Sequence, residues 1–333
     1  MIAAAGLLTY AALLLAAGAP ALARSAWPDR APRLGIAAWL ALPTAAITSV
    51  VLGGAALMVP TERVSGGIAW LLKACQMALR AQYAHPGGTV LATVGGVLAV
   101  MVTARVGWCT MATLSATARA GREHRYRLRL ASREDMRLGA MVIDHEEPAG
   151  YCVPGMRRPV VLTTGALRVL DDTQLTAVLA HERAHQSGRH HLLVALAAVP
   201  AAAFPRVPAF RHARDQVARL AELAADDVAA TRSPRLAVAE ALLTLGTAPA
   251  GAGALGAGGS TAAARVRRLI AAPNPLGRAA SACGMLGVAV LIALPVILLT
   301  APAVGAFGME YCPEVAAAAQ PGPAMAHCAD TGC

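Results

Sequence analysis

Charged residues are scarce in this chain of 333 residues: they make up 14% of it, against about 25% in a typical soluble domain. Aromatic residues are also few, at 4%, whereas apolar residues reach 56%. A composition with so few charged and so many apolar residues excludes a disordered chain and argues against a simple cytosolic enzyme. Lysine is nearly absent, since Lys73 accompanies 28 arginines, and the formal net charge of +10 is therefore almost entirely a property of arginine.

Four stretches are apolar enough to cross a membrane, which takes about 20 helical residues. They are residues 2–22, 36–59, 89–107 and 283–306. The first ends in Ala21-Leu22-Ala23, which resembles a signal-peptidase site, but no positive charge precedes it, and Arg24, Arg30 and Arg33 follow it. A secretory signal has the opposite order of charge, so we predict an uncleaved span with its N-terminus outside.

The arginines indicate how the four spans are oriented. Residues 111–280 hold 22 of the 29 basic residues, and the tail after residue 306 holds none. Because basic loops stay in the cytoplasm, we predict a multi-pass protein of the cell membrane with both termini and residues 60–88 outside. The positive charge then reports topology and contact with the lipid bilayer, and we expect no direct nucleic-acid binding.

This topology divides the chain into four parts. Residues 1–110 form a three-helix membrane region, residues 111–280 a cytoplasmic domain, residues 281–306 the fourth span and residues 307–333 an external, disordered tail. Within the cytoplasmic domain, residues 246–259 are almost all Gly and Ala and predict a flexible linker. The seven cysteines include no C-x-x-C pair, so a thiolate zinc site is not indicated.

The cytoplasmic domain reads as α+β. Loose alternation over residues 125–142 and the apolar run 159–163 predict short strands, and Val160–Thr163 could be either an edge strand that pairs with a peptide or a core strand. Asp171 with Gln174 predicts a capping box, after which helical spacing continues toward Pro200. Further helices are expected over residues 209–230, 236–245 and 265–270. The apolar residues 192–204 are too few to span and predict a buried or re-entrant segment against the bilayer.

The helix expected after the capping box at Asp171 contains an H-E-x-x-H sequence, His181-Glu182-Arg183-Ala184-His185. Imidazoles four residues apart leave the same helix face and can hold one Zn²⁺. Glu182 lies one step round the helix, where its carboxylate can deprotonate water. A polar helix face that only makes surface ion pairs is the alternative interpretation.

The helix expected over residues 209–230 supports the zinc interpretation, because a catalytic zinc needs a third protein ligand. Glu222 can ligate the metal, and Asp226, four residues on, can accept the outer N–H of a ligating imidazole. Asp227 reads as a solvated neighbour or helix cap. His190 and His191 follow the motif closely and could contact the substrate or the oxyanion, although a helix end at the membrane surface explains them equally well.

The chain resembles the integral-membrane zinc peptidases related to the BlaR and MecR antibiotic sensors, which are of the gluzincin type. The resemblance covers about residues 1–306, through the order of the spans and through residues 151–155, 160–165, 175–193 and 222–227. It implies a mainly α membrane protein with a gluzincin-like α+β peptidase domain between the third and fourth spans. It also implies cleavage of the protein itself and of a winged-helix transcriptional repressor. The large external penicillin-binding domain of those sensors is not expected, since about 27 residues follow the last span.

These observations predict a membrane zinc endopeptidase in signal-dependent proteolysis, with Zn²⁺ held by His181, His185 and Glu222 and with Glu182 as the base. One alternative is the same chemistry in membrane-protein quality control, as in HtpX-like and Ste24-like proteases, which share both motifs. Another is a receptor without enzymatic activity that retains a relic zinc site. The presence of Glu182 argues against the receptor, because a purely structural site has no use for a base.

Overall fold

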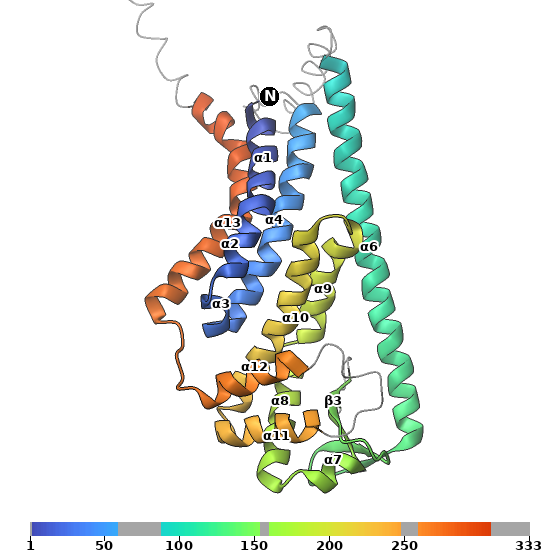
Figure 1. Ribbon diagram of the computed structural model, residues 1–333. Coiled ribbons are helices and arrows are strands. Elements are labelled where there is room, and N and C mark those ends of the chain that lie inside the picture. The colour runs from blue at the N-terminus through green and yellow to red at the C-terminus, as the bar shows by residue number, and fades with distance from the viewer. Residues whose placement is uncertain (1, 59–87, 154–159, 248–258, 308–333) are drawn as a thin grey trace, which may run out of the picture.

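The computed structural model describes residues 2–58, 88–153, 160–247 and 259–307. Four of its helical segments are long and apolar enough to cross a membrane, and they coincide with the four expected stretches. They are α1 (Ile2–Leu13) continued by η1 (Leu14–Gly18) and α2 (Ala19–Arg24), α4 (Pro32–Met58), α6 (Gly88–Ala131) and α13 (Arg278–Phe307). The start of α1 and the end of α13 lie at the same end of the molecule (Figure 1).

Small residues and prolines shape the candidate membrane helices. A methyl group on Gly54 of α4 would lie 2.6 Å from the carbonyl oxygen of Gly95 on α6, so these helices approach closely only because both residues are glycines. The π-helical turn η1 comes just before Pro20, which lacks a backbone N–H and disturbs the regular ladder. A short helix, α3 (Trp27–Arg30), joins α2 to α4.

The remaining elements form the domain at the other end of the molecule, between α6 and α13. The strands are β1 (Ser132–Asp135), β2 (Ala140–Ile143), β3 (Gly150–Cys152) and β4 (Val160–Thr163), and the helices are α7 (Thr164–Val169), α8 (Asp172–Ser187), α9 (His190–Ala203), α10 (Pro208–Ala229), α11 (Arg235–Thr247) and α12 (Gly259–Ile270). The sheet order is β1-β2-β4-β3, and among the described strands only the β2–β4 pair is parallel. Val160–Thr163 is therefore a core strand with neighbours on both sides.

Two expectations about local structure are wrong. Strands were expected from residue 125, but α6 continues to Ala131. The alternation there does not mark two sheet faces, because Tyr126 and Leu130 are 67% and 75% exposed. The helix expected to run toward Pro200 also ends early, at Ser187, where Gly188 and Arg189 form a turn before α9.

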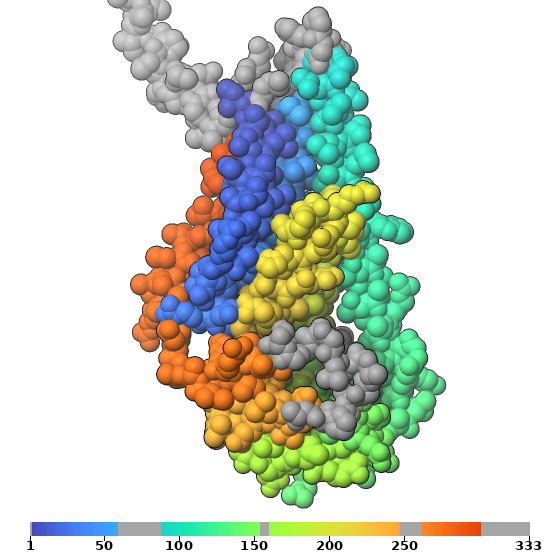
Figure 2. All heavy atoms as spheres, in the orientation of Figure 1, coloured from blue at the N-terminus to red at the C-terminus, as the bar shows by residue number. Residues whose placement is uncertain are grey.

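The apolar helix α9 pairs with α10 in a hairpin that packs against the membrane helices. Figure 2 shows this hairpin lying between the N-terminal helices and α6. Near its tip, Arg105 of α6 donates a hydrogen bond from Nε to the carbonyl oxygen of Ala203. In the core, Trp39 of α4 is buried and meets the ring of His212 on α10 edge-on. The helix that carries Glu222 is thus fixed directly to a candidate membrane span.

The sheet packs on the side of α8 that faces away from α10, and the buried core there extends to α11. Val160 and Leu162 of β4 pack with Val178 and Leu179 of α8 in one buried cluster. Most of the linker expected over residues 246–259 lies outside the described residues, as do residues 60–87 and most of the tail expected over residues 307–333.

Candidate metal centre

The first part of the site is the face that α8 presents to α10. The expected capping box is present: Asp171 accepts hydrogen bonds from the backbone N–H groups of Thr173 and Gln174, and the Gln174 side chain accepts one from the N–H of Asp171. This box starts the helix nine residues before the H-E-x-x-H sequence. His181 and His185 then lie one helical turn apart with their rings in contact.

Glu222 of α10 completes a group of three side chains that could hold a metal ion. His181 Nε2 and His185 Nε2 are 3.0 Å apart, and they lie 3.5 and 3.4 Å from the nearer carboxylate oxygens of Glu222. Two ligand atoms about 2.0–2.1 Å from a tetrahedral zinc are about 3.3 Å from each other. The three donors therefore have the chemistry and the spacing that Zn²⁺ requires.

Asp226 lies behind the His181 ring, on the side away from Glu222. Its Oδ1 is 3.0 Å from His181 Nδ1, a short distance although the two atoms do not have the geometry of a hydrogen bond. The Asp226 side chain is 1% exposed, so its carboxylate serves only groups inside the protein. Asp226 thus lies beside the His181 ring, where its predicted role requires it to be.

His190 has the corresponding position behind His185, and a strained turn puts it there. Arg189 has φ = 50°, in the left-handed region, and a methyl group on Gly188 would lie 2.4 Å from His190 Nε2. The His190 ring is buried, with Nδ1 3.0 Å from His185 Nδ1. Burial and the charge of His185 lower its pKa to about 4, so the ring is neutral and can accept the Nδ1–H of His185.

Glu182 faces a different neighbour, the edge strand β3. The thiol of Cys152 on that strand lies close to the Glu182 carboxylate, and burial together with this carboxylate raises the pKa of Cys152 to about 11. Burial also raises the pKa of Glu182 above its usual value. A half-buried carboxylate with a raised pKa beside a candidate zinc site is suited to accept and release a proton.

The metal-ligand face attracts positive charge. Burial opposes ionisation of Glu222, but hydrogen bonds with His181 and His185 hold its pKa well below the usual range. Burial likewise lowers the pKa of His181, but Asp226 and Glu222 outweigh this effect and raise it to about 9. A site that binds a proton this firmly also favours a cation, which must compete with that proton.

A cavity of about 230 Å³ opens beside these groups. Its polar lining comes from His181, Glu182, Glu222 and Arg265, and the rest from Gly150 and from apolar side chains, namely Ala177, Val178, Val238, Ala241, Leu242 and Leu245. The cavity therefore joins the reactive face to a small apolar recess between α8 and α11.

Some residues of the site were not expected from the sequence. Arg265 of α12 contacts both Glu222 and Asp226, and Cys152 contacts Glu182. A buried acid such as Asp226 calls for a cation, but the sequence does not say which arginine supplies it. His191 is half-buried on α9, and Asp227 is paired with Arg268 rather than left to solvent.

Comparison with known families finds one match, and it lies in this part of the chain. Residues 118–246 match Peptidase family M48, a family of zinc metallopeptidases. The match covers both helices of the candidate metal centre and ends before α12. Searches of the curated proteins and of the solved structures found no match.

Proposed function

We propose, from the match of residues 118–246 to Peptidase family M48, that the protein is a membrane-anchored zinc endopeptidase that cleaves proteins at the cytoplasmic face of the membrane. A zinc metallopeptidase acts on a protein substrate, and the four apolar helices imply contact with lipid. The observation that carries the proposal is the convergence of His181, His185 and Glu222 at zinc-ligand spacing, with Glu182 beside them.

Six polar side chains of the centre have a role in this proposal. His181, His185 and Glu222 hold the zinc, which when bound polarises the scissile carbonyl and makes water more acidic. Glu182 takes the proton from the attacking water and passes it to the leaving amine. Asp226 and His190 accept the outer N–H groups of the two ligating imidazoles and fix their tautomers.

The sheet suggests how a substrate lies in the site. β4 cannot pair with a peptide, because β2 and β3 occupy both of its sides. Within the described residues, β3 pairs with β4 alone, and its Cys152 contacts the base. An extended peptide added to β3 would run past Glu182 and could place an apolar side chain in the adjacent cavity.

The biological role that we propose is signal-dependent proteolysis of a repressor or of the protein itself. Comparing new protein N-termini in cells that express the wild type or Glu182→Gln would test it. Cleavage of a few proteins, among them a winged-helix repressor, only in stimulated wild-type cells would support this role. Broad turnover of membrane proteins without a stimulus would favour quality control, and identical N-termini in both strains would favour a receptor with a relic site.

The orientation of the membrane helices gives a separate prediction. In a variant without the seven native cysteines, a cysteine at Ile2 should react with a membrane-impermeant maleimide in intact cells, and one at the exposed Arg232 should react only after permeabilisation. The reason is that α1 starts at the end of the molecule opposite the arginine-rich domain (Figure 1). Labelling of position 232 in intact cells would contradict the cytoplasmic placement of the peptidase domain.

A further inference from the structure

The metal centre includes one side chain from outside the segment matched to the peptidase family. Arg265 lies on α12, after residue 246, where the match ends. Seven residues separate the end of α12 from α13, the last apolar helix. The side chain that reaches the centre therefore comes from the helix that leads into the fourth candidate span.

Arg265 binds both carboxylates that shape the metal site. Its Nε and Nη2 donate to the two oxygens of Asp226 at 2.8 and 2.7 Å, and its Nη1 lies 3.0 Å from Glu222 Oε2. This planar fork fixes the Asp226 carboxylate in the orientation that places Oδ1 beside His181 Nδ1. The same guanidinium restrains the proposed third ligand, Glu222.

Charge explains why an arginine is needed there. Asp226 is almost completely buried, and a buried carboxylate without a cationic partner is strongly destabilising. Glu182, Glu222 and Asp226 together carry three negative charges, and a zinc ion leaves one of them without compensation. Arg265 supplies the missing positive charge without occupying a histidine nitrogen.

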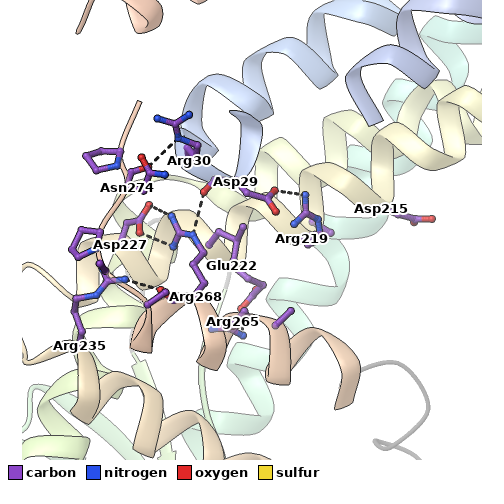
Figure 3. A pocket seen from close by; sticks show the side chains of 17 residues that line it. Asp29, Arg30, Asp215, Arg219, Glu222, Asp227, Arg235, Arg265, Arg268 and Asn274 are labelled. Carbon is purple, nitrogen blue, oxygen red and sulfur yellow. Dashed lines mark hydrogen bonds and ion pairs between the residues drawn. The ribbon is translucent and has the colours of Figure 1, made fainter. Parts of the chain in front are cut away.

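A second arginine on α12 makes the same kind of bond outside the centre. Arg268, one turn after Arg265, donates from Nη1 and Nη2 to the two oxygens of Asp227 at 2.7 and 2.9 Å, and from Nε to the carbonyl oxygen of Asp29 at 3.1 Å. Figure 3 shows Arg268 between Asp29 and Asp227, while Arg265 approaches Glu222. Successive acids of α10 are thus held by two arginines of α12, and only one of the two pairs belongs to the metal centre.

We propose that Arg265 is a positioning residue of the zinc site: it orients the carboxylates of Asp226 and Glu222, so that α12 forms part of the site. Arg268, by contrast, only docks α12 on α10 and α3. This inference rests on the zinc site proposed above. It adds that the segment matched to the peptidase family, which ends at residue 246, does not include Arg265, one of the side chains of the zinc site.

Zinc titration of the purified, metal-depleted full chain in detergent tests this role. We expect Arg265→Gln to bind zinc at least about 10-fold more weakly than the wild type, as for the loss of other outer partners of metal ligands. Arg265→Lys should also lose several-fold, because an ammonium cannot hold two carboxylates as a planar fork does. Arg268→Gln is the matched control and should stay within about 2-fold. Cobalt in place of zinc gives a second readout, since its visible spectrum should change in the Arg265 variants alone.

Several outcomes would overturn the proposal. Equal losses in Arg265→Gln and Arg268→Gln would mean that Arg265 only docks α12. Unchanged or tighter zinc binding in Arg265→Gln would mean that the arginine does not support the site or competes with the metal for Glu222. If the Gln variant does not fold, the Lys variant decides, and wild-type affinity there contradicts the proposal. A wild type that binds no zinc would instead refute the metal site itself.

Discussion

Glu182→Gln should abolish proteolysis while the protein keeps its zinc and its fold. The amide has nearly the same size as the carboxylate but cannot accept the proton of the attacking water, and such base catalysis typically contributes about 10²–10⁴-fold in rate. Glu182 is not among the three side chains that could hold the metal, so zinc content should not change. Cleavage of a native substrate, or of the chain itself, by purified protein measures the loss.

Glu240→Gln provides the matched control for this variant. Glu240 is exposed on α11, and the same substitution there should leave the cleavage rate unchanged. Wild-type cleavage by Glu182→Gln, with one zinc still bound per chain, would remove Glu182 from the mechanism. Loss of zinc in that variant would instead show that Glu182 supports the metal.

Asp226→Asn is expected to reduce zinc affinity or activity by roughly 10 to 100-fold, the usual effect of removing an acceptor behind a ligating histidine. The amide is a weaker acceptor for His181 and cannot satisfy the fork of Arg265 as a carboxylate does. Asp227→Asn should have much less effect on zinc, because Asp227 bonds to Arg268. A metal-binding titration and a cleavage assay on both variants make the comparison.

Equal effects at the two aspartates would contradict this assignment. They would mean that both residues act by holding α12 against α10, and that Asp226 has no particular relation to His181. No effect at Asp226 would also put the position of Glu222 in question, since the two residues share one face of α10.

The parts of the fold that depend on local sequence could be predicted well. The four apolar stretches, the capping box at Asp171 and the strand at Val160–Thr163 are all present, because helix caps and long apolar runs act through neighbouring residues. The spacing of His181 and His185 likewise places both rings on one helix face whatever surrounds them.

What the sequence could not show depends on tertiary contacts. The turn at Gly188 separates α8 from α9 although apolar spacing continues through it, and the structure uses it to bring His190 against His185. The helix through residues 125–131 continues α6, although its alternating side chains suggested a strand. Arg265 reaches Asp226 across 39 residues of chain, and no local pattern distinguishes it from the other arginines of α12.

Anomalous X-ray diffraction at the zinc absorption edge, from crystals of the purified protein, tests the proposed zinc site most directly. We expect one anomalous peak within about 2.0–2.2 Å of His181 Nε2, His185 Nε2 and a carboxylate oxygen of Glu222. Asp226 and His190 should lie behind the two rings, outside bonding distance of the metal. No peak at this position in zinc-supplemented protein, or a zinc bound by other side chains, would contradict it.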